Sequence, residues 1–330
     1  MNPPPLDEKE DARMVASGER PTLSFVVPAH DEEDSIERCV VSIGRFAPEG
    51  LSREVIVVDN GSKDQTANVA RKAGATVVSS NGATIAAARN DGVRTSRGDV
   101  LVFLDADCAL TEGWGEEFTH LLERIHQVHP CCAGSQVFPP PDESVFLWKY
   151  WFEPFVTQGS ASHVGSAHMI CARDAFHAVG GFDESLETGE DFDFCARIRR
   201  AGGEVLNVPA LRVDHYGFPR TWRQFFRRER WHGRGDAMSL TTFLSSKVAV
   251  ASVSFVALFV VGVLAGAAGF GLGGWLSLCG AMLVLLAASI VKFRHAGLRV
   301  HAMSLMILPV YFLARSFSVA DALRRRLSSI

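Results

Sequence analysis

The sequence predicts an α/β domain with an open, mostly parallel sheet flanked by helices, followed by an interfacial helix and a C-terminal helical membrane anchor. Three observations support this prediction. Short apolar runs that end at acidic or turn residues alternate with helix-spaced segments in the first third of the chain. Between Arg220 and Arg234, arginines mix with tryptophans and phenylalanines at helical spacing. From Lys247 to Lys292, the 44 intervening positions contain no charged residue and no histidine.

The composition of the 330-residue chain is that of a folded protein with about two or three structural units. With 47% hydrophobic and 21% charged residues, it is neither wholly disordered nor a small disulfide scaffold. The net charge of −4 is unevenly spread along the chain. Residues 1–245 carry 36 acidic and 25 basic side chains, whereas residues 246–330 carry one acidic and eight basic side chains. The acidic first part predicts no nucleic-acid partner, and the basic, apolar end favours an anionic membrane surface.

The expected strands are short apolar runs that stop at turn residues or acids, which is typical of parallel strands buried on both faces. They cover residues 23–27, 55–58, 76–78 and 100–104. Residues 33–46 and 66–73 have helical spacing and lie between strands, so the order is that of an open α/β sheet. A further helix is expected from Glu190 to Ala201, where two glycines follow.

Glycines divide the apolar C-terminal region into two expected membrane spans, at about 248–268 and 275–291. A third apolar segment, 301–320, contains Pro309 and is expected to be interfacial or re-entrant, since a third crossing would place Arg324 and its neighbours outside. The same rule favours a cytoplasmic position for the front domain at a bacterial-type inner or plasma membrane. The cysteines lack zinc-site spacing and fit reduced thiols of that compartment.

Acids follow several of the expected strands. A single Asp at such a position often just ends a strand or caps a helix. The carboxyl ends of parallel strands share one edge, however, so the acids that follow them are expected to line one crevice. They are Asp31, Glu32, Glu33, Asp59, Asp105 and Asp107. Two carboxylates spaced as in Asp105-Ala106-Asp107 offer hard oxygens to a divalent cation, which favours Mg²⁺ or Mn²⁺ over zinc.

Four segments in this order resemble the successive motifs of family 2 glycosyltransferases with a GT-A fold. They are SFVVPAHDEE from Ser24, VVDNGSKDQT from Val57, ARNDG from Ala88 and LDAD from Leu104. With Glu190, Asp191 and His215, the resemblance covers residues 22–235. It implies a GT-A-like fold and an enzyme that transfers a hexose from a nucleotide sugar, most often a uridine-linked one.

The resemblance also implies roles for individual residues. The donor-binding positions would be Pro28, Ala29, Asp31 and Glu33 in the nucleotide loop, Asp59 at the base, Arg89 near the phosphates and Asp105 near the ribose. Asp107 and His215 would hold the metal, and Asp191, with Glu190 beside it, would be the catalytic base of an inverting enzyme. The family often has Asn where this chain has Asp31. From position alone, Glu190 and Asp191 are equally explained as acids that open a helix.

On the acceptor side, we expect His168, Arg230 and Trp231, with a hydrogen-bonded loop histidine as the alternative for His168. A membrane-tethered domain predicts a membrane-associated acceptor such as a polyprenyl phosphate or a lipid-linked glycan. Arg227, Arg230 and Trp231 also fit a loose pattern of processive polysaccharide synthases. A short synthase of that kind and a non-catalytic nucleotide-sugar-binding membrane scaffold are the alternative functions.

These expectations divide the chain into five parts. Residues 1–20 are a disordered tail, 21–130 the nucleotide-sugar-binding half, and 131–220 the acceptor-binding and catalytic half. Residues 221–245 form the interfacial amphipathic helix, and 246–330 the membrane region.

Overall fold

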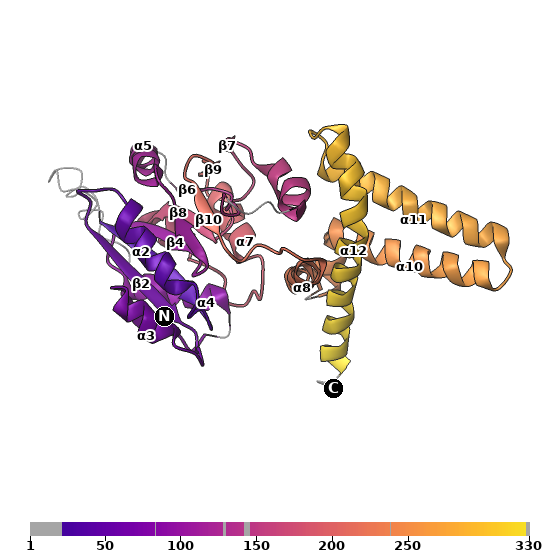
Figure 1. Cartoon of the computed structure of the whole chain (residues 1–330), viewed down its shortest axis with the longest axis horizontal. Coiled ribbons are helices and arrows are strands. Elements are labelled where there is room, and N and C mark those ends of the chain that lie inside the picture. The colour runs from indigo at the N-terminus through magenta and orange to yellow at the C-terminus, as the bar shows by residue number, and fades with distance from the viewer. Residues whose placement is uncertain (1–21, 83, 128–129, 142–145, 238, 328–330) are drawn as a thin grey trace.

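The computed structural model describes residues 22–82, 84–127, 130–141, 146–237 and 239–327, so the predicted tail lies outside the described residues. Figure 1 shows the sheet domain at one end of the molecule and a hairpin of two long helices at the other, with α8 (Trp222–His232) and α12 (Leu298–Leu327) between them. The order of elements therefore follows the predicted division into an α/β domain and a helical anchor.

An eight-stranded, mostly parallel sheet forms the first domain, in the order β3-β2-β1-β4-β8-β6-β9-β7. The predicted strands are all present as β1 (Leu23–Ala29), β2 (Arg53–Asp59), β3 (Thr76–Ser79) and β4 (Val100–Leu104). β1 pairs in parallel with both β2 and β4, and Ala29 lies opposite Asp59. This register brings the carboxyl ends of the first strands to one edge, as the sequence predicted.

Helices cover both faces of this sheet. On one face pack α2 (Ile36–Phe46), α3 (Thr66–Lys72) and α5 (Trp114–Gln127), and on the other α4 (Ile85–Thr95), α6 (Arg173–Ala178) and α7 (Glu190–Arg200). Neighbouring residues of β1 point to opposite cores, since Phe25 packs in the first and Val26 in the second. A strand that is apolar at every position is thus explained by burial on both faces.

The second half of the sheet consists of strands that apolar runs did not reveal. β6 (Cys131–Gly134) and β9 (Glu204–Asn207) are parallel, whereas β8 (His168–Ala172) is antiparallel to both β4 and β6. The short β7 (Gly159–Ser160) closes the edge. A separate two-stranded sheet pairs β5 (Cys108–Leu110) with β10 (Val213–His215). Tertiary pairing stabilises these short segments, which local patterns alone do not mark as strands.

Segment 221–245 contains two helices rather than one. α8 begins with a capping box at Thr221 and ends at Gly233; a 3₁₀ turn, η3 (Gly235–Ala237), then leads to α9 (Leu240–Ser245). A wide turn at η1 (Trp148–Phe152) and η2 (Glu153–Phe155) packs Trp151 against Phe225 of α8 and Tyr311 of α12. Trp151 is therefore a core residue of this junction, and Trp148 is buried against Phe138 and Phe218.

Three helices are long and apolar enough to cross a membrane: α10 (Lys247–Ala267), α11 (Gly271–Lys292) and residues 298–322 of α12. The first two match the predicted spans. The third segment was expected to be short, but it is part of a continuous 30-residue helix that contains Pro309. Figure 1 shows α12 running across the hairpin, where Phe312 contacts Phe255 and Ser304 contacts Ser289. Its length and composition would permit a crossing, so the interfacial or re-entrant placement stays a prediction.

A buried carboxylate joins α8 to α12. Glu229 is 3% exposed, and its carboxylate oxygens lie 2.6 Å from a guanidinium nitrogen of Arg228 and 3.3 Å from one of Arg315. Burial by itself would raise the pKa of Glu229, but these two cations outweigh it and hold the pKa below its usual value. The ion pair therefore contributes stability above the unfolded-state pKa and loses it as the pH falls.

Removing the charge with Glu229→Gln should destabilise the helix junction by about 3–5 kcal/mol, because two arginines then lose a buried partner. We expect a lower midpoint of thermal unfolding for the full chain in detergent. The exposed Glu123→Gln on α5 is the matched control and should leave the midpoint unchanged. Equal midpoints for the Glu229 variant and the parent would contradict this role.

Candidate active site

The loops after β1 and β2 are tied together at the edge of the sheet. Asp31 has a φ of 55°, and its Oδ1 accepts a hydrogen bond of 2.7 Å from the backbone N–H of Lys63. Glu33 accepts one of 2.9 Å from Gln65 N–H, and Asp59 accepts one of 3.1 Å from Ser62 N–H. With Pro28 and Ala29 at the end of β1, these residues form a continuous, acidic rim. The expected donor-binding loop residues thus lie together, although the Glu33 carboxylate also fixes the loop itself.

Arg89 is the central bridge of the site. It comes from α4, is only 1% exposed, and pairs with Asp105 at 2.7 Å and with Glu190 at 2.8 Å. Its buried Nε has no partner among the described residues. Both terminal nitrogens bind carboxylates, and the expected role of Arg89 near the donor phosphates stays a prediction. Arg89 connects the end of β4 with the start of α7.

Asp191 occupies the first turn of α7, next to Glu190. Glu190 is buried and accepts a hydrogen bond of 2.9 Å from the Ser166 hydroxyl. The Asp191 carboxylate is half-buried and accepts bonds from the backbone N–H groups of Phe192 at 2.7 Å and Ser166 at 3.3 Å. Burial, and next the charge of Glu190, raise the pKa of Asp191. A carboxylate with a raised pKa is a better proton acceptor than an ordinary one.

Asp107 and His215 lie side by side after β4 and at the end of β10. The His215 Nε2 is 3.1 Å from Asp107 Oδ2. Burial alone would raise the pKa of Asp107, but the hydrogen bond and charge of His215 outweigh it, so the pKa is lowered and the carboxylate stays ionised. An ionised carboxylate and an imidazole offer an oxygen and a nitrogen ligand to a divalent cation.

The surroundings of this pair fit a bound cation. The buried Nδ1 of His215 has no hydrogen-bond partner among the described residues, and a Cβ at Gly217 would collide with the Asp107 carboxylate. Potential ligand atoms of Asp107, Cys108 and His215 all lie within 4.8 Å of one another. Burial raises the pKa of the Cys108 thiol well above its usual value, and hard cations prefer oxygen, so Cys108 is the weakest of the three ligands.

Glu32 was expected at this edge with the other acids, but the resemblance assigned it no role. Burial, and next the charge of Asp107, raise its pKa to about 7. Glu32 is partly buried and lies close enough to Asp107 and Asp105 to feel their charges. The sequence placed it in a run of three acids, Asp31, Glu32 and Glu33, and spacing alone did not show which of them is partly buried.

His168, expected on the acceptor side, has no exposed surface. Its Nε2 accepts a hydrogen bond of 3.0 Å from the Trp114 indole, and its Nδ1 lies 2.7 Å from the Ser135 hydroxyl. Both ring nitrogens are therefore engaged inside the protein, which favours the alternative of a hydrogen-bonded histidine. Burial lowers the pKa of His168 to about 3, so the ring is neutral in the folded protein.

A buried neutral histidine predicts acid sensitivity. In the unfolded chain the His168 ring takes up a proton at about pH 6.5, whereas in the folded chain its pKa is about 3. The stability from the neutral ring should therefore be fully present above pH 6.5 and should be lost as the pH falls below 6.5. We expect the thermal midpoint of the parent to drop between pH 6.5 and pH 4. His168→Gln should be less stable at pH 7.5 but should show a smaller drop, and an equal drop in both proteins would contradict this assignment.

Arg230 and Trp231 lie on α8. Arg230 forms two hydrogen bonds of 2.7 Å with Asp321 of α12, and Trp231 is 39% exposed and stands edge-on to His232. The structure therefore places Arg230 in the helix junction. Trp231, on the same helix, keeps an exposed ring.

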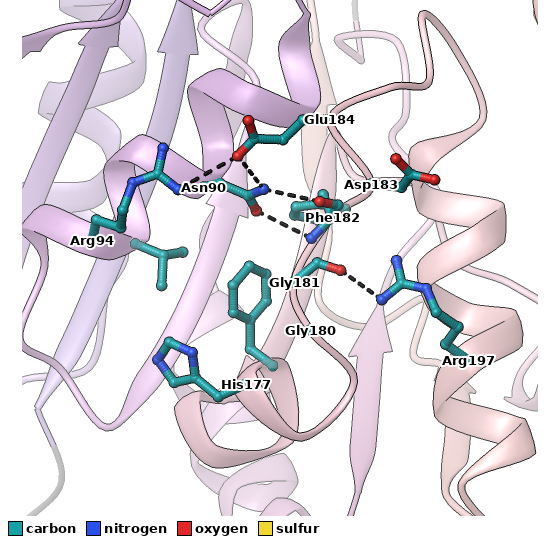
Figure 2. Close-up of a pocket in the computed structure, with 11 residues that line it drawn as sticks. Asn90, Arg94, His177, Gly180, Gly181, Phe182, Asp183, Glu184 and Arg197 are labelled. Atoms are coloured by element: carbon teal, nitrogen blue, oxygen red, sulfur yellow. Dashed lines mark hydrogen bonds and ion pairs between the residues drawn. The ribbon is translucent and has the colours of Figure 1, made fainter. Parts of the chain in front are cut away.

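A cavity of about 570 Å³ lies beside the site, between α4, α6 and α7. Figure 2 shows that its polar side chains largely pair with one another: Asn90 bonds to the backbone of Phe182 and to Glu184, and Glu184 also contacts Arg94. These bonds fasten the turn at Gly180 and Gly181, which precedes the loop that carries Asp191. The cavity is therefore bordered by structural contacts of that turn.

Comparison with known proteins connects this geometry to a family. The sequence pattern described as Glycosyl transferase family 2 matches residues 24–176, and the one described as Glycosyl transferase family group 2 matches residues 102–317, well over half of the chain.

Two curated relatives are similar over part of their length. Glycosyltransferase AglE of Haloferax volcanii is 25% identical over 194 residues, which cover 55% of this chain and 62% of that protein. Pre-mycofactocin glycosyltransferase of Mycobacterium tuberculosis is 30% identical over 208 residues, which cover 58% of this chain and 42% of that protein. The similarity thus spans about half the length of these relatives.

A solved structure shares the fold. The mannosyltransferase PcManGT from Pyrobaculum calidifontis, in complex with GDP-Man and Mn²⁺, superimposes with a TM-score of 0.59. The match covers 92% of this chain and 88% of that one at 16% sequence identity. At this identity the likeness establishes the fold, which is the GT-A-like architecture that the sequence predicted.

Proposed function

Because the chain belongs to family 2 of the glycosyltransferases, we propose that it transfers a hexose from a nucleoside diphosphate sugar to a membrane-associated acceptor, with inversion at the anomeric carbon. One observation carries this proposal. Arg89 joins Asp105, from the nucleotide side, to Glu190, the neighbour of Asp191, although the three residues are far apart in the sequence. Arg89 thus connects a candidate donor residue with the neighbour of the candidate base.

Asp191 is the base in this proposal. Its raised pKa, caused first by burial, makes it able to take the proton of the incoming acceptor oxygen. Attack from the face opposite the leaving diphosphate needs a single base and inverts the configuration. Glu190 keeps its buried charge paired with Arg89, so it acts on the base through its own negative charge rather than by proton transfer.

In this proposal Asp107 and His215 would hold Mg²⁺ or Mn²⁺ near the donor diphosphate. When bound, such an ion neutralises negative charge that develops on the leaving diphosphate. Asp107 is kept ionised by His215 and can serve as a ligand across the physiological pH range. Asp59 and the Asp31 loop are proposed to contact the base of the nucleotide, with uridine as the first candidate. Guanosine-linked donors remain in the test, because PcManGT was solved with GDP-Man.

The membrane acceptor is proposed from the arrangement of the helices. α8 and α12 lie between the sheet domain and the α10–α11 hairpin (Figure 1), so the sheet domain is tethered beside the apolar helices. A polyprenyl phosphate or a lipid-linked glycan is the acceptor that such a tether favours. The positive-inside rule places the domain on the cytoplasmic side, since Lys292, Arg294 and Arg299 follow the second span.

The experiment is a donor panel offered to the full chain in lipid vesicles with extracted membrane lipids. Released nucleoside diphosphate and glycosylated lipid are measured with Mn²⁺, with Mg²⁺ and with a chelator. We expect release from one uridine-linked donor, formation of a glycolipid of inverted anomeric configuration, and loss of both with the chelator. Donor binding without release under any condition would instead support the non-catalytic scaffold, and products of many sugars on one acceptor would support the synthase.

A further inference from the structure

We propose that Thr188 is a positioning residue, through which membrane-region helix α12 and helix α8 hold the loop of Asp191 in its active geometry. This inference rests on the proposed function of Asp191. It concerns the short segment Thr188 to Asp191, which leads directly into α7. Its consequence is that the C-terminal helices, besides anchoring the chain, form part of the catalytic machinery.

Thr188 connects the catalytic loop with the end of α8. Its side chain is 6% exposed, its hydroxyl donates to the His232 carbonyl at 3.3 Å, and its Oγ1 accepts from the Gly235 N–H at 3.1 Å. A Cβ on Gly235 would lie 2.7 Å from that Oγ1, so the two segments are in close contact. One buried hydroxyl therefore bonds to groups on both sides of the turn that ends α8.

The same turn is held from the other side by α12. Arg230 makes a bidentate ion pair with Asp321, and the Ser318 hydroxyl donates to the Arg230 carbonyl at 2.5 Å. A Cβ on Gly233 would collide with the Ser318 hydroxyl, so the chains approach more closely than a side chain allows. α12 thus fixes the residues immediately before the His232 carbonyl to which Thr188 bonds.

Arg315 fastens both ends of this turn to α12. Its guanidinium lies 3.3 Å from Glu229, before His232, and 3.1 Å from Asp236, after Gly235. The two bonds of Thr188 fall between these anchors. A shift of α12 would therefore move the partners of Thr188 together rather than one at a time.

Other contacts of this segment lie on either side of Thr188, since Glu190 bonds to Arg89 and to Ser166. Gly189 has a φ of 82°, a left-handed conformation that other residues rarely adopt, so the chain turns sharply between Thr188 and Glu190. The earlier part of the loop is fastened by Asn90 and Glu184, as Figure 2 shows, but these contacts lie at residues 182–184. Thr188 is thus a contact, three residues before Asp191, that ties this loop to the turn after α8.

The test compares Thr188→Val, which keeps the shape but loses both hydrogen bonds, with Thr188→Ser, which keeps the hydroxyl. Transfer rates, acceptor KM and donor affinity are measured for the full chain in vesicles. We expect Thr188→Val to lower kcat for transfer roughly 10- to 100-fold, because a misplaced base costs rate. Donor affinity should stay at the parental value, and Thr188→Ser should restore most of kcat. Thr119→Val, at an exposed threonine on α5, is the matched control and should show the parental kcat and donor affinity.

A second arm tests the connection to α12. Arg230→Asp and Asp321→Arg should each lower kcat in the same way, and the double variant should recover part of the loss. Parental kcat in Thr188→Val, or an equal loss in kcat and donor affinity that Ser does not rescue, would overturn the inference. The two proposals fail differently. If Asp191→Asn keeps parental turnover, the proposed base is wrong and the inference falls with it; if only Thr188→Val is parental, the base stands and the inference falls.

Discussion

Asp191→Asn should reduce sugar transfer about a thousandfold, within the range by which a positioned base accelerates a reaction. The amide keeps the size of the side chain and can still accept the N–H of Phe192 through its oxygen, but it cannot take up a proton. Donor affinity should stay within about twofold of the parent. The measurement is single-turnover transfer together with equilibrium binding of the donor.

The matched control is Asp193→Asn, the same change two residues further along α7, where the carboxylate pairs with Arg197 at 2.7 Å. It should retain transfer. A loss as large as that of Asp191→Asn would show that any lost acid on this helix disrupts the site, and parental transfer in Asp191→Asn would exclude it as the base. The pH profile gives an independent check: the pKa of Asp191 is raised by burial and by Glu190, so the acid limb of kcat should lie above that of an ordinary aspartate.

Asp107→Ala should nearly abolish transfer, by about a thousandfold or more, since loss of metal stabilisation at the diphosphate is worth several kcal/mol. Unlike the Asp191 variant, it should also weaken metal-dependent donor binding. His215→Ala should raise the Mn²⁺ concentration needed for half-maximal transfer, because it removes the nitrogen ligand and the partner that keeps Asp107 ionised.

Cys108→Ala is the control that tests the donor set. Its thiol is close enough to be a ligand, but a hard cation binds thiols weakly. The Mn²⁺ concentration needed for half-maximal transfer should therefore equal that of the parent. A chelator should stop the parent and Mn²⁺ should restore it. Full transfer by Asp107→Ala in the presence of chelator would remove the metal from the proposal altogether.

The features that could be predicted from the sequence are those that depend on patterns of neighbouring residues. Apolar runs such as 100–104 marked the parallel strands, and the acids that follow them converge because parallel strands share one edge. The charge-free stretch between Lys247 and Lys292 marked two helices of membrane length. Periodicity and composition are properties of neighbouring residues, so they can be recognised without knowing the fold.

Contacts between residues far apart in the sequence could not be predicted in this way. β8 pairs antiparallel with β4 across more than sixty positions, and nothing in its five residues specifies that partner. The burial of His168 and the partial burial of Glu32 depend on which elements pack above them. The two ion pairs of Arg89 likewise depend on where α4 lies relative to β4 and α7.

The sequence by itself determined the fold class, the edge of the sheet at which the acids gather and the two spans of the hairpin, because each follows from a repeating pattern of side chains. Only the tertiary structure decided that α12 is one long helix crossing the hairpin and that α8 ends against the loop of Asp191. The physical reason is that an ion pair such as Arg230 with Asp321 joins residues 91 positions apart, and the chain must fold before its geometry exists.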